Sequence, residues 1–442
     1  MQTDIFARRL TEKTPLSRHA ATIEGYFSFP KLEGPIGPRM GLNGREMVCW
    51  SLNNYLGLSN HPEVREADAA AAAEYGMGYP MGSRLMSGDT ELHDELERQL
   101  SEFVGKEATM LLNFGYQGAF SIVDALLDRH DAVVYDKDVH ACTYDGIRMQ
   151  TCHRFSFRNN DLAHLEKQLI RATEATEKSG GGILVLIEGV YGMGGHQGKV
   201  AEVVALKEKY NFRLLLDDAH GFGVLGETGA GTGEAQGCQD GVDLYYSTFT
   251  KSMSTMGAFI SGGLEILEHM KYTVRSQVFS KTIPMPVIVG ALKRLDMIRT
   301  RPELRERLWK NVHSLQAGLY DHGFLDGNIL GESCITPVFL KHDDYVESVA
   351  MVCDLRDAYG IFTSIMVYPV VPKGTMMLRL TATALHTERD IDETLHGFTK
   401  VREKLAAGFY SDALNDGPIA AGVRRREDAL RQKAELVTTS VA

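Results

Sequence analysis

The stretch Arg213-Leu-Leu-Leu-Asp217-Asp-Ala-His220 decides the fold, because its apolar run ends in two carboxylates and a histidine. Similar short apolar runs alternate with helical patterns along the middle of the chain; they cover residues 109–113, 132–135, 182–188, 213–217, 244–248 and 258–261. This alternation predicts βαβ units and an α/β fold, in which a mainly parallel sheet lies between two layers of helices. Ligands of such sheets bind beyond the carboxyl ends of the strands, so the residues that follow each run are candidates for a site.

The remaining segments predict further parts of the molecule. A Gly/Pro-rich stretch precedes the alternating block, and helical runs with a strand pattern at residues 376–380 follow it. We expect an N-terminal arm over residues 1–55, a large domain over 56–301, a smaller C-terminal α+β domain over 302–405 and a polar tail over 406–442.

Composition excludes several classes of protein. The formal net charge of −11 argues against a broad electrostatic footprint for DNA or RNA, so nucleic acid is not an expected partner. The N-terminus lacks the apolar stretch of a secretory signal, and no run of about 18 apolar residues is present. Six cysteines without a CxxC pair predict free thiols in a reducing cytoplasm. We therefore expect a cytoplasmic protein.

The first group of candidate site residues is Asp217 to His220. A carboxylate at the end of a buried strand is costly to bury, which favours a functional role for Asp217. The apolar run followed by two aspartates also fits a Walker-B strand, but the chain has no G-x-x-x-x-G-K-[ST] loop to accompany one. An aspartate here could instead be the N-cap of a helix, but that role accounts for one aspartate and not for the second one or for His220.

The second group is Ser247-Thr-Phe-Thr-Lys251, which also follows an apolar run. Lys251 could form a Schiff base with an aldehyde cofactor, while Thr248 and Thr250 bind its phosphate. Most lysines are solvated surface residues, but here Asp217 can keep a pyridinium nitrogen protonated and His220 can bind the ring hydroxyl. These companions favour the catalytic interpretation of Lys251.

Three weaker features follow other runs. Asn113-Phe-Gly-Tyr-Gln-Gly118 opens a helix at about residue 119, and the backbone amides of Gly115, Tyr116 and Gln117 could bind a phosphate. His140 could stack on a planar cofactor, although surface or core histidines are commoner. The Gly-rich stretch 229–233 lacks a preceding strand and predicts a flexible loop, not a dinucleotide site. No metal-binding pattern is present.

Taken together, these motifs resemble the α-oxoamine synthase family of pyridoxal-phosphate enzymes over roughly residues 24 to 405. The matching segments are Asn53-Asn-Tyr-Leu-Gly57, Gly82-Ser-Arg84, His140, Asp217 to His220, Thr248 to Lys251, and Arg379. The resemblance implies the aspartate-aminotransferase-like fold (fold type I), with a seven-stranded sheet, and pyridoxal 5′-phosphate as cofactor. It further implies that Arg379 binds a substrate carboxylate and that Asn53 contacts the substrate.

Within this family, Thr250 and Ser252 around the lysine resemble the serine palmitoyltransferase branch. That branch implies a decarboxylative Claisen condensation of L-serine with a long-chain acyl-CoA such as palmitoyl-CoA, giving 3-ketosphinganine, CoA and CO2. Synthases of 8-amino-7-oxononanoate, 2-amino-3-ketobutyrate (glycine C-acetyltransferase) or 5-aminolevulinate are alternatives. A silent regulatory subunit of the same fold is another, but silent paralogues lose the lysine that is present here.

The resemblance also implies a homodimer, in which residues 275–280 and Thr282 reach the partner's phosphate site; Ser280 and Thr282 are the candidates. The long-chain product that the resemblance implies is membrane-soluble, so peripheral contact with a membrane is possible, but the basic cluster at residues 424–426 is too short to support it alone. The chain departs from the family at Tyr191-Gly-Met-Gly-Gly195, where relatives carry a serine after the aromatic residue. Its loss places more weight on His220 as the partner of the ring hydroxyl.

Overall fold

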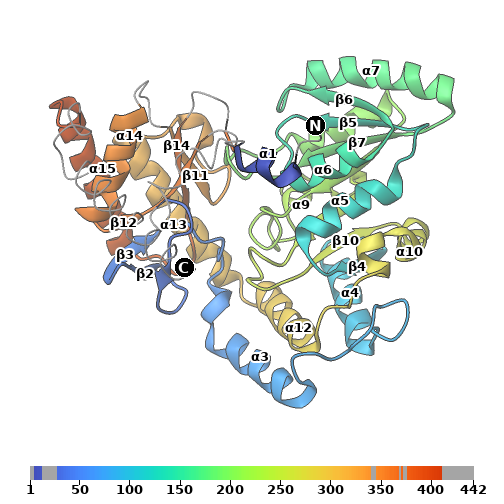
Figure 1. Ribbon diagram of the computed structural model, residues 1–442, viewed down its shortest axis with the longest axis horizontal. Helices are drawn as coiled ribbons and strands as arrows, with labels where there is room; N and C mark the ends of the chain where they lie inside the picture. Colours follow the sequence, from blue (N-terminus) through green and yellow to red (C-terminus); the bar gives the residue numbers. More distant parts are fainter. Residues whose placement is uncertain (1–3, 12–26, 340–344, 368–369, 372–375, 411–442) are drawn as a thin grey trace.

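The computed structural model describes residues 4–11, 27–339, 345–367, 370–371 and 376–410, and it shows a larger and a smaller part (Figure 1). The larger part is built on a seven-stranded sheet in the order β4-β10-β9-β8-β7-β5-β6, with only β10 antiparallel to its neighbours. Its strands are β4 Ala108–Leu112, β5 Ala132–Asp136, β6 His153–Phe157, β7 Ile183–Glu188, β8 Arg213–Asp217, β9 Leu244–Thr248 and β10 Ala258–Gly262. This confirms the predicted seven-stranded, mainly parallel sheet.

Helices cover both faces of this sheet, because alternate apolar residues of each strand point to opposite sides. In β8, Leu215 packs with one core cluster, while Leu214 and Leu216 pack with the other. One face is covered by α5 Gly115–Leu126, α6 Ala141–Met149 and α10 Leu264–Thr273, and the other by α4 Glu91–Phe103, α7 Leu162–Ser179, α8 Val200–Ala205 and α12 Met285–Thr300.

Six strands coincide with the predicted apolar runs, and β6 is the one that the runs missed. It lies at the edge of the sheet, and four of its five side chains are exposed or half-buried. An edge strand needs no continuous apolar run, so its sequence resembles a polar loop. Helix α5 begins at Gly115, about one turn earlier than predicted.

The smaller part combines the C-terminal domain with the N-terminal arm. One sheet has the order β11-β14-β13, with strands β11 Ile335–Phe339, β13 Ser364–Met366 and β14 Met377–Thr381. The other has the order β1-β2-β3-β12, with strands β1 Leu32–Glu33, β2 Arg39–Leu42, β3 Arg45–Cys49 and β12 Ile361–Phe362. The expected arm is therefore paired with the expected C-terminal domain, through the parallel contact of β3 with β12.

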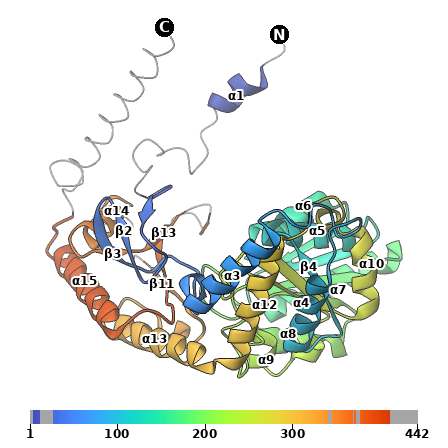
Figure 2. The same ribbon diagram turned by 90° about the horizontal axis from the view of Figure 1, so that it is seen from below.

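Helices α13 Pro302–Asp321, α14 Tyr345–Asp357 and α15 Glu388–Ala406 belong to the smaller part, while α3 Pro62–Tyr75 packs along α12 between the two parts (Figures 1 and 2). The short helices are α1 Ile5–Thr11, α9 Thr232–Ala235 and α11 Arg275–Val278. Of the expected tail, only residues up to 410 are described, so the basic cluster at 424–426 lies outside the described residues. No helix in the described part of the chain is long and apolar enough to cross a membrane.

Candidate active site

Four neighbouring strands of the sheet end in polar residues at one edge. His140 follows β5, Glu188 ends β7, Asp217 ends β8, and Lys251 follows β9. These strands are adjacent and parallel, so their carboxyl ends meet. Glu188 and Asp217 are paired in register, which places both carboxyl groups on the same face of the sheet, next to α5 and α6.

Asp217 and Asp218 are separated by the alternation of the strand. Asp218 has 0% exposure and accepts hydrogen bonds from Thr232 N (2.7 Å), Thr232 Oγ1 (2.6 Å) and Tyr245 Oη (2.9 Å). It thereby holds the stretch 229–233, which is buried and not the flexible loop that the sequence predicts. Asp217 faces the other way, toward Lys251 and His140. Asp218 is therefore structural, and Asp217 is the candidate for chemistry.

Lys251 is half-buried at this edge. Among the residues that the structure describes, its amino group makes no hydrogen bond or ion pair. The surrounding protein lowers the pKa of Lys251, although the charges of Asp217 and Glu188 oppose the effect. Burial likewise raises the pKa of Asp217, against the opposing charges of Lys251 and His140. A lysine with a lowered pKa is more often unprotonated and can attack an aldehyde.

The two histidines lie on either side of this pair. His140 is the N-cap of α6, its ring is exposed, and its Nδ1 accepts a hydrogen bond from Cys142 N at 3.3 Å. His220 is half-buried, with Nδ1 2.6 Å from the hydroxyl of Tyr55. Partial desolvation by the surrounding protein lowers the pKa of His140 against the opposing charge of Asp217, and burial lowers the pKa of His220, so both are neutral near pH 7.

The N-terminus of α5 closes one end of the site. Gly115 lies so near the end of β9 that a Cβ there would come within 3.0 Å of Thr248 Oγ1 and 3.2 Å of Tyr246 Oη. The first amides of a helix have no partners within it, so those of Gly115, Tyr116 and Gln117 can bind an anion. The Thr250 hydroxyl lies 3.0 Å from that of Thr248. The side chains of Tyr116 and Gln117 are exposed, so only their amides are candidates.

Arg379 reaches the site from β14 of the smaller part. It is 5% exposed, and its Nε donates to Gly192 O at 2.7 Å. Both terminal nitrogens lie 3.3 Å from Asn53 Oδ1. Asn53 therefore orients the guanidinium directly, a contact that the sequence does not reveal. A guanidinium held in this way is suited to binding a carboxylate.

Glu188 is the site residue that the sequence analysis missed. It is 5% exposed and accepts a hydrogen bond from His140 N. Burial and the nearby charge of Asp217 raise the pKa of Glu188 well above its ordinary value. Because it ends an apolar run just as Asp217 does, its position was the available signal.

Two predicted residues lie away from this cluster within one chain. Thr282 is 4% exposed, and its hydroxyl lies 3.1 Å from His93 Nε2. Ser280 lines a hollow between α5 and α11 together with Gln117. Their expected role concerns a partner subunit, so it stays a prediction.

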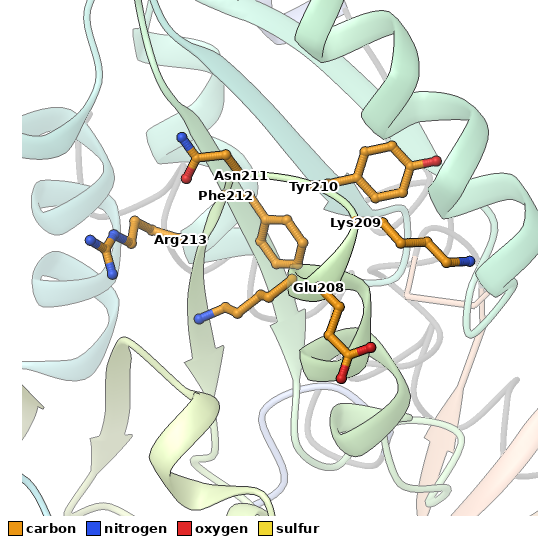
Figure 3. A pocket seen from close by; sticks show the side chains of 7 residues that line it. Glu208, Lys209, Tyr210, Asn211, Phe212 and Arg213 are labelled. Carbon is orange, nitrogen blue, oxygen red and sulfur yellow. The ribbon is translucent and has the colours of Figure 1, made fainter.

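A second hollow lies at the opposite end of β8, around the loop from Lys207 to Arg213 (Figure 3). Its basic side chains are already engaged: Lys207 and Arg213 contact Asp243, and Lys209 contacts Glu166. This hollow is therefore a poor candidate for a ligand site.

The residues at the carboxyl edge fit pyridoxal phosphate. An unpaired lysine amino group can bind the aldehyde, and the buried Asp217 can hold the ring nitrogen protonated. The exposed His140 ring can stack on the cofactor ring, and the N-terminus of α5 offers amides for the phosphate. The donor set matches the chemistry of each part of the cofactor.

Comparison with known proteins gives the same picture. Residues 45–398 match the profile of the aminotransferase class I and II family. The chain is 54% identical to a cysteate-C-fatty acyltransferase from Capnocytophaga ochracea, and the match covers 92% of this chain and 96% of that protein. It is 32% identical to a serine palmitoyltransferase from Sphingobacterium spiritivorum, and that match covers 85% of this chain and 92% of the relative. A solved lysine-to-alanine variant of serine palmitoyltransferase from S. paucimobilis, with a bound aldimine of pyridoxal phosphate and myriocin, has a TM-score of 0.83 and 28% identity, covering 92% of this chain and 100% of that one. The chain therefore belongs to the α-oxoamine synthases, within the aminotransferase class I and II family of pyridoxal-phosphate enzymes.

Proposed function

We propose that this α-oxoamine synthase transfers a fatty acyl group from acyl-CoA to the α-carbon of L-cysteate, with release of CoA and CO2. The observation that carries the choice of amino acid is the 54% identity to a cysteate-C-fatty acyltransferase over nearly the whole of both chains. The acyl C–S bond breaks as the new C–C bond forms, and the carboxylate leaves as CO2. The product is a long-chain 2-amino-3-ketone that keeps the sulfonate.

Substrate binding is assigned to Arg379 and the residues that orient it. Its guanidinium binds the α-carboxylate of the amino acid, because planar donors match carboxylate oxygens. Gly192 O and Asn53 Oδ1 fix its orientation before the substrate arrives. Such preorganisation lowers the entropic cost of placing the α-carbon next to Lys251.

Proton transfer is assigned to Lys251, Asp217 and His140. When bound, pyridoxal phosphate supplies an electron sink for charge on the substrate's α-carbon. Asp217 keeps the ring nitrogen protonated, and Lys251 removes the proton from the α-carbon once its amino group is free. His140 supplies a neutral N–H near the carboxylate, since its Nδ1 already accepts from Cys142 N.

L-Serine is the second candidate for the amino acid, with palmitoyl-CoA as the acyl donor. It is supported by Thr250 and Ser252 beside Lys251 and by the 32% identity to a serine palmitoyltransferase. The assay that separates the candidates measures CoA release from acyl-CoAs of several chain lengths with L-cysteate, L-serine, glycine or L-alanine. We expect kcat/KM to be at least about 100-fold higher for L-cysteate.

A higher kcat/KM for L-serine would contradict the cysteate assignment and favour the second candidate. Release of CoA only with glycine or L-alanine would favour the other synthases. A 2-oxo acid formed without CoA release would point to transamination. Complete inactivity of folded, cofactor-loaded protein would favour the regulatory subunit.

The proposal includes a cytoplasmic homodimer. None of the six cysteines forms a disulfide in the described part of the chain, which is consistent with a reducing compartment. The loop between α3 and α4 exposes Met77, Met81 and Met86, and Phe279 is exposed beside it. The two segments are joined by a hydrogen bond from Thr282 N to Gly82 O at 3.0 Å. A group of exposed apolar side chains on joined segments is typical of an interface, and a second copy of this chain is the partner we assign to it.

A further inference from the structure

Tyr55 is a buried residue that the proposed reaction does not use. It has 0% exposure, and its hydroxyl lies 2.6 Å from His220 Nδ1. The centroids of the two rings are 6.2 Å apart and the rings are tilted by 42°, so the residues are hydrogen-bonded and not stacked. Tyr55 therefore interacts directly with a candidate cofactor residue.

The surroundings of Tyr55 fix its position. Its carbonyl accepts from Ala384 N at 2.7 Å. The preceding Asn54 accepts from Ser254 Oγ at 2.7 Å, and Ser254 belongs to the loop that carries Lys251. Gly57 has a φ of 75°, and a Cβ there would come within 2.5 Å of Leu385. The motif from Asn53 to Gly57 is thus clamped between the smaller part and the Lys251 loop.

The direction of the hydrogen bond follows from the neighbouring groups. Burial, together with the charges of Lys251 and Arg379, lowers the pKa of His220, so its ring is neutral and carries one proton. Burial raises the pKa of Tyr55, so its hydroxyl keeps its proton. The Arg379 guanidinium interacts with this hydroxyl and can only donate. His220 Nδ1 is therefore the acceptor for the Tyr55 proton, since the nearby guanidinium offers no acceptor.

The other ring nitrogen of His220 remains available. With Nδ1 acting as an acceptor, the ring proton lies on Nε2. Among the described residues, Nε2 has no hydrogen-bond partner. It lies beside Gly192, where a Cβ would come within 2.5 Å of it, so the glycine provides the room that the ring occupies.

We propose that Tyr55 is a positioning residue that holds His220 as the Nε2–H tautomer, so that Nε2 donates to the ring oxygen of bound pyridoxal phosphate. This donor stabilises negative charge on the ring oxygen and so lowers the pH at which the lysine-bound cofactor loses its proton. The inference rests on the cofactor and not on which amino acid is the substrate.

The test is a pH titration of the absorbance of the lysine-bound cofactor, without amino acid or acyl-CoA. We expect Tyr55→Phe to raise the midpoint by about one pH unit, the effect of losing a hydrogen bond to a charged group. Because Tyr55 acts through His220, Tyr55→Phe should cause no further shift in a His220→Gln background. Tyr245→Phe is the matched control, since it removes another fully buried tyrosine hydroxyl, bonded to Asp218. Its midpoint should equal that of the wild type.

An unchanged midpoint in Tyr55→Phe, or additive shifts in the double variant, would overturn the proposal. A second measurement does not depend on the folding of any variant. In wild-type holoenzyme labelled with 15N-histidine, His220 should show a protonated Nε2 and an unprotonated Nδ1, assigned by comparison with His220→Gln. A proton on Nδ1 would overturn the proposal. Since no substrate is added, neither outcome depends on the proposed amino acid.

Discussion

Adjacent residues at the end of β8 have different consequences for the molecule. Asp217 shares a face with Glu188 and is directed toward Lys251, whereas Asp218 is enclosed by Thr232 and Tyr245. The difference follows from the alternation of side chains along a strand, which turns each neighbour to the opposite face. Substituting each aspartate separately should therefore separate chemistry from stability.

We predict that Asp218→Asn changes the pH dependence of stability. Burial raises the pKa of Asp218 from 3.8 to about 7, although its hydrogen bonds from Thr232 and Tyr245 oppose the shift. The folded state therefore binds this proton more tightly than the unfolded state. The stability that the group contributes is fully present below about pH 4 and is lost as the pH rises to about 7.

The measurement is the Tm of the apoprotein between pH 4.5 and 8, for the wild type and Asp218→Asn. The difference in Tm between the two proteins should change across this range and become constant above about pH 7. Asp217→Asn is the contrasting variant, expected to lose most activity because the ring nitrogen loses its partner. A constant difference between wild type and Asp218→Asn at every pH would contradict the prediction.

Candidate site residues could be selected from the sequence because they follow predicted strands. Contacts between residues far apart in the chain could not be predicted. Lys251, Asp217, His220 and His140 could be selected because each follows an apolar run, and the structure brings them together. Tyr55 meets His220 across 165 residues, and no local pattern encodes that contact. Glu188 also ends an apolar run, so the same signal was available for it; the sequence could not show its register with Asp217 on the neighbouring strand.

Among the elements, the loop between β7 and α8 joins the two parts of the molecule. Gly195 has a φ of 70°, and a Cβ there would come within 2.4 Å of Ile335 O on β11. Ser333 Oγ donates to Gly195 O at 2.6 Å, and Arg379 Nε donates to Gly192 O. The loop thus fixes the smaller part, and Arg379 with it, relative to the sheet.

We predict that Gly195→Ala destabilises the protein by about 3 kcal/mol, because the new methyl group meets backbone as well as an unfavourable φ. Gly180→Ala is the matched control: its φ is 78°, but nothing lies within 4 Å of its Cβ position. It should cost only about 1 kcal/mol, the penalty of a side chain in the left-handed region. Denaturant unfolding measures both values, and KM for the amino acid should rise only in Gly195→Ala. Equal effects of the two variants would contradict the contact argument.

Strands that are buried on both faces of the sheet were predicted correctly. Segments whose burial depends on contacts with distant residues were not. The six apolar runs became strands because both faces of the sheet are covered by helices. β6 is at the edge, so its sequence lacked that signal. The stretch 229–233 is Gly-rich, and only the contact with Asp218 shows why it is buried. The pairing of β3 with β12 joins segments about 300 residues apart in a chain of 442 residues, which patterns cannot reveal.

At the scale of the whole molecule, four strongly exposed apolar side chains lie on two segments that are joined to each other. Met77, Met81 and Met86 are 72%, 78% and 81% exposed, and Phe279 is 74% exposed. Met285 N donates to Tyr79 O at 2.9 Å, so the loop that carries the methionines is attached to the segment after Phe279. This segment includes Ser280 and Thr282, which the family resemblance assigns to the partner's phosphate site. A dimer formed here would place the half-buried Ser280 at the interface and the buried Thr282 just behind it.

We predict that Phe279→Glu, combined with Met81→Glu, shifts the protein from dimer to monomer. Burying two unpaired carboxylates in an apolar interface costs several kcal/mol, enough to weaken association by more than about 100-fold. Light scattering after size-exclusion chromatography measures the mass, and cofactor affinity should fall with it because Ser280 and Thr282 then lack their partner.

Tyr320→Glu is the control, since Tyr320 is 49% exposed on α13 of the smaller part. It should remain a dimer with unchanged cofactor affinity; dissociation of Tyr320→Glu, or an intact dimer in the double variant, would place the interface elsewhere.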